Sequence, residues 1–141
     1  MNLKKGEIIF AATHAELLNS VLGTHYKAWM KSGTKLRDGK WLWMIELTNS
    51  KSSAGFINKL VGTERISEKH LGTEFTFENH NTYVNAMMTG KPYDASDRVV
   101  FDVVKSGYSR RYIFRGVFRL NKEECTQTEN IWDLIMPEYS F

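Results

Sequence analysis

Cysteine is nearly absent from this sequence, because Cys125 is the only one among 141 residues. A single cysteine excludes an intramolecular disulfide, an all-cysteine zinc site and the disulfide framework of a small secreted domain. We therefore expect a cytoplasmic protein. No neighbour of Cys125 in the sequence would lower the pKa of its thiol, so we expect no nucleophilic role for it.

Long hydrophobic runs are also absent. The apolar stretch Ile8-Ile9-Phe10 is far shorter than the core of a signal peptide or a membrane span. We therefore expect no membrane association. At 42% hydrophobic composition the chain can bury one core and is too short for two ordinary domains. We expect a single domain over residues 1–141.

No strong excess of charge is present. Nineteen Lys and Arg residues against sixteen Asp and Glu give a net charge of +3. This mild excess is compatible with nucleic acid, a nucleotide or an acidic protein surface as the partner. The basic residues are dense in the first forty positions, where we expect a positively charged side: Lys4, Lys5, Lys27, Lys31, Lys35, Arg37 and Lys40.

Local patterns predict short strands and two short helices. A capping box, Thr13-His-Ala-Glu16, predicts a helix that ends at Gly23, and Asn81 predicts the start of a second helix that closes near Gly90. The turn Asp38-Gly39 predicts a hairpin between strands at residues 26–31 and 41–47, and residues 48–55 form a polar loop. Further strands are expected at residues 8–10, 56–57, 65–66, 75–77, 99–104, 112–120 and 131–136. Because strands and helices do not alternate, we expect an α+β domain with a mainly antiparallel sheet, curled or closed into a β-barrel.

The strand at residues 112–120 separates into two chemically different faces under period-two alternation. One face is apolar and is expected in the core: Tyr112, Phe114, Gly116, Phe118 and Leu120. The other face carries Arg111, Arg115 and Arg119 with Ile113 and Val117. Successive arginines would lie about 13 Å apart, a spacing that suits a charged backbone. This pattern predicts an anionic partner.

Tryptophans are the second group of candidate binding residues. Trp29 would share a strand face with Lys27 and Lys31, so we expect it at a wet surface where its ring can stack on a base. Trp41 and Trp43 lie on an apolar face and are expected to be buried.

Metal and catalytic motifs are weak. His14, His25, His70 and His80 are scattered without a close ligand pair, so we expect no metal and no cofactor. The residues Asp38-Gly-Lys40 match the carboxylate-x-lysine end of a nuclease-like motif, in which carboxylates hold magnesium. The same residues make a hairpin turn, which we favour, because only Glu7 could serve as the upstream acid.

The opening segment, residues 4–10, looks like the entry strand of PUA-like barrel domains, the group of EVE, ASCH and SRA-type modules. Segments 56–58, 64–66, 111–120 and 131–132 are similar to small domains associated with bacterial restriction proteins. The resemblance implies a pseudobarrel that grips a flipped or modified base in an aromatic-lined pocket while basic residues hold the backbone. An attached nuclease domain is not expected.

These observations favour a nucleic-acid-binding module, a reader of modified bases in restriction or phage defence. The expected binding residues are Arg111, Arg115, Arg119, Lys27 and Lys31, with Trp29 as the stacking residue. An alternative is a small phage-type inhibitor or sequestering protein that binds a host defence protein or a nucleotide signal. A nuclease is the second alternative. A homo-oligomer is compatible with each of these three functions.

Overall fold

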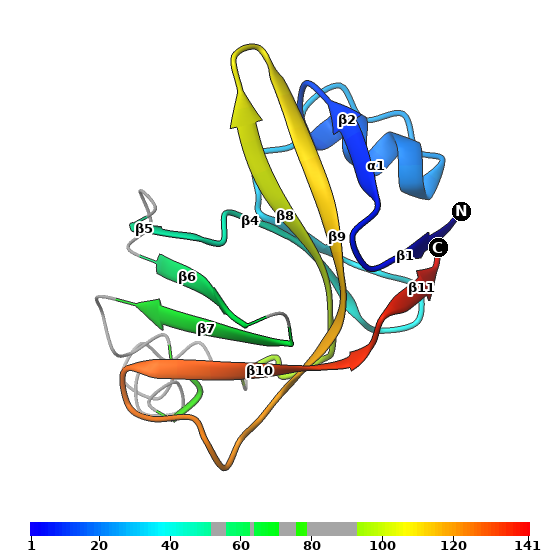
Figure 1. Cartoon of the computed structure of the whole chain (residues 1–141). Coiled ribbons are helices and arrows are strands. Elements are labelled where there is room, and N and C mark those ends of the chain that lie inside the picture. Colours follow the sequence, from blue (N-terminus) through cyan, green and yellow to red (C-terminus); the bar gives the residue numbers. More distant parts are fainter. Residues whose placement is uncertain (52–55, 63, 71–75, 79–92) are drawn as a thin grey trace, which may run out of the picture. The chain divides into compact units, whose positions relative to one another are not determined.

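The computed structural model describes residues 1–51, 56–62, 64–70, 76–78 and 93–141 (Figure 1). The chain divides into two compact units. The first unit comprises Met1–Glu46, Asp97–Phe118 and Leu134–Phe141, and the second comprises Leu47–Ser96 and Arg119–Asp133. None of the helices in these described ranges is long and apolar enough to span a membrane.

A four-strand ladder organises the first unit. Strands β3 (Gly33–Lys35), β4 (Trp41–Ile45), β8 (Arg98–Ser106) and β9 (Ser109–Leu120) are neighbours in that order, and β2 (Ile8–Ala11) also pairs with β9. The pairings are antiparallel except that of β4 with β8, which is parallel. The chain ends meet in an antiparallel pair of β1 (Asn2–Lys4) with β11 (Glu138–Ser140) (Figure 1).

Helix α1 (His14–Leu22) confirms the predicted first helix. The Thr13 side chain accepts a hydrogen bond from the Glu16 amide at 3.2 Å, and the Glu16 carboxylate accepts one from the Ala12 amide at 2.7 Å. Gly23 ends the helix in the left-handed conformation. The buried face of the helix consists of Ala15, Leu17, Leu18 and Val21.

The second unit contains the remaining strands. β5 (Thr48–Lys51), β6 (Phe56–Val61), β7 (Arg65–His70) and the start of β10 (Glu129–Met136) form an antiparallel ladder in the order β10-β7-β6-β5. The strands expected at residues 56–57, 65–66 and 131–136 are therefore confirmed.

Several sequence predictions differ from the structure. Residues 26–31 form no strand, and β3 takes their place as the hairpin partner of β4. Residues 48–51, expected in a loop, form β5. Phe77, expected in a strand, is helical, and the second helix expected from Asn81 lies outside the described residues. A mainly antiparallel sheet is confirmed, but its described pairings do not close into a barrel, since β3 and β5 each end the strand order.

A β-bulge in β9 changes which side chains face the core of the first unit. Phe101 pairs with Phe114 whereas its neighbour Val100 pairs with Gly116, so Arg115 is the extra residue. The core cluster therefore includes Tyr112, Phe114 and Val117. Sequence alternation placed Val117 on the arginine face, which is wrong because one extra residue shifts the alternation. Phe118 and Leu120 are buried, as expected, but neither belongs to this core cluster, and Phe118, which pairs with Arg98, lies on the face opposite Phe114.

Gly116 is required at the bulge for two reasons. Its φ is +108°, and a Cβ there would lie 2.5 Å from Leu134 Cδ1 and 2.6 Å from the Met136 carbonyl oxygen. We expect Gly116→Ala to lower the free energy of unfolding by about 3 kcal/mol or more, from strain and overpacking together. Gly107→Ala is the control, because Gly107 has a φ of +61° but open space around it. Urea denaturation measures both, and equal losses would contradict this role of close packing.

His14 predicts an acid-sensitive fold. Its Nδ1 lies 2.8 Å from the Tyr112 hydroxyl, and burial, with the charges of Arg110 and Lys105, lowers its pKa from 6.5 to about 4. Between these two pH values the unfolded chain binds a proton that the folded chain does not, so stability should fall as the pH drops from 6.5 to 4. We expect His14→Asn to reduce the loss of stability between pH 6.5 and pH 4 by about 2 kcal/mol. This is less than the full pKa shift implies, because His14 is half-exposed. An identical pH profile in the variant would contradict the prediction.

Candidate nucleic-acid interface

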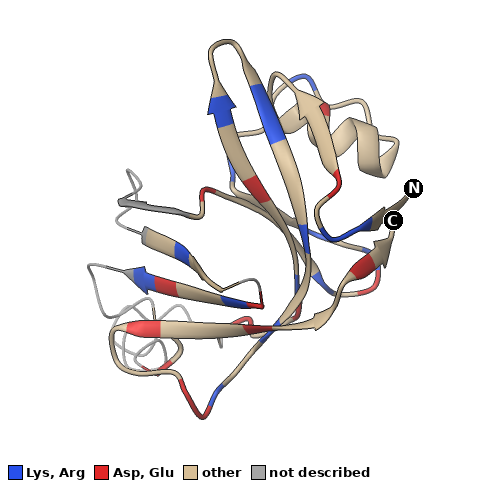
Figure 2. Ribbon diagram, in the orientation of Figure 1, with Lys and Arg blue, Asp and Glu red and all other residues tan. Residues whose placement is uncertain are grey.

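The five cations predicted to bind an anion do not form one cluster. Lys27 and Lys31 are exposed on the segment before β3. Arg111 is exposed on β9 in the first unit, while Arg119 is exposed and belongs to the second unit. Basic and acidic residues are interspersed over both units rather than gathered by sign (Figure 2). The arginines therefore do not lie together on one face, as the sequence predicted. The binding role of each cation stays a prediction.

Arg115 is held by a carboxylate rather than directed to solvent. Its guanidinium donates to Asp102 at 2.9 Å, and the side chain of Asp102 is only 9% exposed. The bulge places Arg115 for this pair, and its Nε is buried without a hydrogen-bond partner. The ion pair gives Arg115 a structural role that the sequence pattern did not indicate.

The pair makes Arg115 a stability determinant. We expect Arg115→Ala to lower the free energy of unfolding by about 3 kcal/mol, because it removes the ion-pair partner at 2.9 Å from the buried Asp102 carboxylate. Adding Asp102→Asn to this variant should recover part of the loss, since the amide carries no charge. A double-mutant cycle by urea denaturation measures the coupling, and additive effects would contradict it.

Trp29 does not lie on the expected strand. Its ring packs against the core of the first unit, and the centre of the ring lies 4.8 Å from the centre of the Tyr26 ring. Its Nε1 is buried without a hydrogen-bond partner. Because the predicted strand is absent, Lys27 and Lys31 do not share a strand face with it. Base stacking by Trp29 stays a prediction.

Trp41 and Trp43 lie on the face of β4 opposite the core. Leu42 and Met44 point into the core instead, and both tryptophans are half-buried. The prediction that the two indoles are core residues is therefore wrong, because alternation along β4 assigns the inward face to the smaller apolar residues. The side chain of Arg98, on the neighbouring strand β8, lies over both indole rings.

Polar side chains cross three neighbouring strands of the second unit on one face. Asn58 on β6 pairs in register with Glu68 on β7, and Glu68 pairs with Asn130 on β10. Glu68 Oε1 accepts hydrogen bonds from Asn130 Nδ2 at 2.9 Å and from Trp132 Nε1 at 3.2 Å. We call Asn58, Glu68, Asn130 and Trp132 the polar cluster.

Asn130 is fully satisfied within the polar cluster. Besides Glu68, its Nδ2 donates to the Tyr93 hydroxyl at 3.0 Å, and its Oδ1 accepts from the Phe77 amide at 2.8 Å. The residue is 2% exposed, so these bonds fix its amide and the carboxylate of Glu68 in place.

Asn58, unlike Asn130, is not fully hydrogen-bonded. It is 8% exposed, and its Oδ1 is buried without a hydrogen-bond partner. A buried carbonyl oxygen without a donor costs about 1–3 kcal/mol of stability. A bound ligand or water molecule can supply the missing donor. The sequence analysis did not single out Asn58 or Glu68, although both lie in or beside the segments similar to restriction-associated domains.

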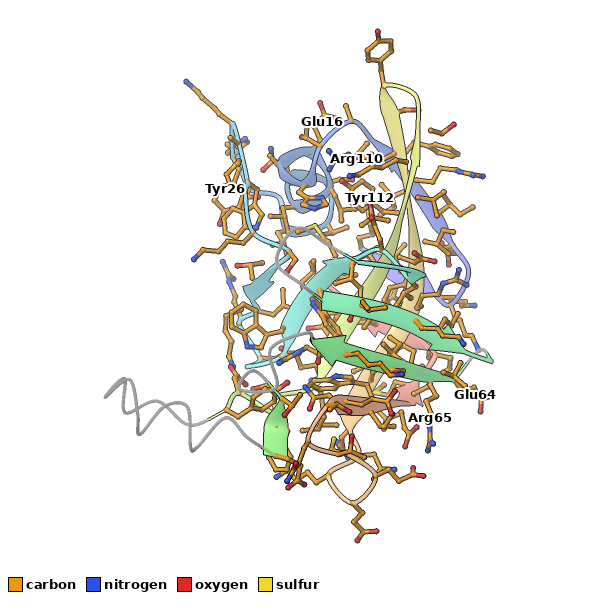
Figure 3. The ribbon with its side chains drawn as sticks, turned by 90° about the vertical axis from the view of Figure 1, so that its left-hand side faces the viewer. Glu16, Tyr26, Glu64, Arg65, Arg110 and Tyr112 are labelled. Carbon is orange, nitrogen blue, oxygen red and sulfur yellow. The ribbon has the colours of Figure 1, made fainter. Side chains whose placement is uncertain are left out.

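On the opposite face of the second unit, charges neutralise one another. Arg65 donates to Asp133 at 2.7 Å and pairs with Glu124, and Asn121 Nδ2 donates to both carboxylates. Arg65 lies at the edge of this unit next to Glu64 (Figure 3). Hydrogen bonds to the two carboxylates raise the pKa of Arg65, which fixes its charge. The arrangement is an ion-pair network rather than an open anion site.

The structure also describes the nuclease-like motif, the cysteine and the possible metal ligands. Asp38 accepts from the Lys40 amide at 3.0 Å and from the Tyr139 hydroxyl at 2.6 Å, and Gly39 has a φ of +90°, so Asp38-Gly-Lys40 forms the predicted turn. Burial raises the pKa of the Cys125 thiol. In the part of the chain that the structure describes, no three His, Cys, Asp or Glu side chains are placed to hold a metal.

The two amides of the polar cluster give a matched test of this geometry. We expect Asn58→Leu to leave the free energy of unfolding unchanged or raise it by up to about 2 kcal/mol, because it removes an unsatisfied buried oxygen. Asn130→Leu should lower it by about 3 kcal/mol, because the Phe77 amide and the Glu68 carboxylate lose a partner. Thermal denaturation of both variants measures the difference, and a large loss in Asn58→Leu would contradict the assignment of Asn58.

Comparison with known proteins defines the class. The sequence profile of the family described as "SET and RING associated domain", SRA, matches residues 2–141. The chain belongs to the SRA family, a group with the PUA-like fold, which confirms the resemblance drawn from the sequence. No curated protein sequence matches significantly.

A solved structure gives the same fold. The chain is similar to the 5-hydroxymethylcytosine-specific restriction enzyme AbaSI, with a TM-score of 0.68 and 18% sequence identity. The likeness covers 99% of this chain and 42% of that enzyme. The chain therefore spans less than half the length of its structural relative.

Proposed function

We propose that this chain is a DNA-binding module that reads a modified cytosine. SRA domains bind nucleic acid, which supports the class of ligand. The 5-hydroxymethylcytosine specificity in the name of the similar enzyme supports the type of base. The observation that carries the proposal is the buried Asn58 Oδ1, which has no donor although it lies beside a fixed carboxylate.

The chemistry of the polar cluster suits a cytosine edge. Cytosine presents an amino group that donates hydrogen bonds, and carboxylates are its ordinary protein partners. Asn58 Oδ1 and the Glu68 carboxylate are both acceptors. The hydroxyl of a hydroxymethyl group would supply a further donor. Extruding a base from a duplex costs a few kcal/mol, and satisfying a buried acceptor offsets part of that cost.

The biological setting is part of the same proposal. We propose that reading the modified base serves restriction or phage defence, in the cytoplasm. Cleavage is not assigned to this chain, because the likeness covers only 42% of the restriction enzyme.

Binding to three matched duplexes tests the proposal. The duplexes differ at one position, which holds cytosine, 5-methylcytosine or 5-hydroxymethylcytosine, and fluorescence anisotropy at fixed salt gives each Kd. We expect the 5-hydroxymethylcytosine duplex to bind about five- to a hundredfold tighter than the plain one, the range of one good base contact, because its hydroxyl is a donor that the other two bases lack. In Asn58→Leu this preference should fall to near one while the protein stays folded.

Lys59→Ala is the control for the Asn58 variant. Lys59 follows Asn58 on β6, is exposed and faces the other way, so its loss should leave the preference for the modified base unchanged. Equal affinity of the wild type for all three duplexes would reject the proposal. A preference that survives in Asn58→Leu would remove the polar cluster from the site.

A further inference from the structure

Strand β2 has one unpaired edge in the first unit. Its only strand partner among the described strands is β9. The Phe114 amide donates to the Glu7 carbonyl oxygen at 2.9 Å, at the start of this pairing. Alternate residues of an antiparallel strand direct their N–H and C=O groups to opposite edges. Ile9 therefore continues the bonding to β9, whereas the backbone groups of Ile8 and Phe10 point away from it and meet no strand in the described part of the chain.

The side chains along this edge are apolar and accessible. Phe10 is 71% exposed and Ile8 is 44% exposed. Both lie on the face of the sheet opposite the core, where Arg111 and Ile113 of β9 stand beside them in register. On the other face, Ile9 is only partly buried, so helix α1 does not cover the strand completely. A partner can therefore approach this edge.

The composition of β2 does not prevent pairing with another chain. Charged residues and proline on an edge strand normally do so. The two strands at which the described strand order ends each carry a lysine, Lys35 on β3 and Lys51 on β5. Strand β2, with the sequence Ile-Ile-Phe-Ala, has neither a charged residue nor a proline (Figure 2). An edge of this composition favours a partner strand.

The edge is complementary to a second copy of itself. Around a two-fold axis at Ile9, Ile8 of one copy lies opposite Phe10 of the other, and the reverse. Ile8 and Phe10 are the residues whose backbone groups point to the unpaired edge, so this register forms both pairs of hydrogen bonds. It also places an aromatic ring beside a β-branched side chain twice, which is a favourable cross-strand pair.

We propose that β2 pairs antiparallel with β2 of a second copy, and that the protein dimerises through this edge. The contact is short, with four residues on each side. We therefore expect a weak dimer, with a dissociation constant on the order of 10 µM. Each copy keeps its own polar cluster, so the dimer would carry two sites for the proposed function. The pairing itself does not depend on that function.

Analytical ultracentrifugation between about 1 and 200 µM tests the contact, because association depends on concentration. The wild type should change from monomer to dimer over this range. Phe10→Ser should raise the dissociation constant at least about tenfold, because one substitution removes both aromatic pairs of a two-fold contact. Tyr108→Ser is the matched control. Tyr108 is a fully exposed aromatic residue in the turn between β8 and β9, outside β2, so this variant should dimerise like the wild type.

Cysteine cross-linking tests the register. In the proposed pairing, position 9 of one copy lies directly opposite position 9 of the other, and a Cα–Cα distance of about 4.5 Å suits a disulfide. Ile9→Cys should therefore give a covalent dimer under mild oxidation. In Ala12→Cys the two thiols would lie about 20 Å apart, six residues at ~3.3 Å each, so this exposed cysteine should not cross-link. The native Cys125 is buried and should contribute little background.

The outcomes separate this proposal from the proposed function. A wild-type protein that stays monomeric over the whole range would overturn the dimer; if Phe10→Ser then weakened binding to every duplex, the exposed face of β2 would contact DNA instead. Equal loss of the dimer in Tyr108→Ser, or equal cross-linking in Ala12→Cys, would also overturn it. A dimer that binds all three duplexes equally would support the contact and reject the proposed function alone.

Discussion

The β-bulge at Arg115 and Gly116 is the constraint on which the arrangement of the first unit depends. It inserts one residue into β9, so that Val117 follows Phe114 into the core and Arg115 turns to Asp102. Only glycine fits at position 116, because its φ is positive and the Met136 carbonyl would lie 2.6 Å from a Cβ. Asp102 in turn lies two register positions beyond Val100, the partner of Trp43, on the strand that begins with Arg98.

Features of the sequence that depend on near neighbours were predictable. Thr13, Glu16 and Gly23 defined the first helix, and Asp38-Gly39 defined a turn, because capping and positive φ angles are local requirements. The strands at residues 99–104 and 112–120 were also predictable, because the pattern of side chains along a strand is local, and they form the paired strands β8 and β9.

Features that depend on distant partners were not predictable. Strict alternation assigned Arg115 to an open face, because nothing in the local sequence reveals an inserted residue or the carboxylate of Asp102. The burial of Trp41 and Trp43 was predicted wrongly because both faces of β4 carry apolar side chains, and only packing decides which of them is buried. Asn58 and Glu68 look like ordinary surface residues until the strands place Asn130 and Trp132 beside them.

The second unit offers fixed hydrogen-bond acceptors, of which Asn58 Oδ1 is unsatisfied. Acceptors suit the donor edge of a cytosine. In the first unit, the Arg98 guanidinium lies over the rings of Trp41 and Trp43.

The side-chain amide signals of Asn58 and Asn130 in a ¹H–¹⁵N spectrum test the central claim most directly. Both are buried amides of one cluster, but only Asn58 has a vacant acceptor. Adding a duplex with one 5-hydroxymethylcytosine should shift the Asn58 signals strongly and those of Asn130 little, and the plain duplex should shift neither to the same extent. Unchanged Asn58 signals in a complex saturated with the modified duplex would contradict the account.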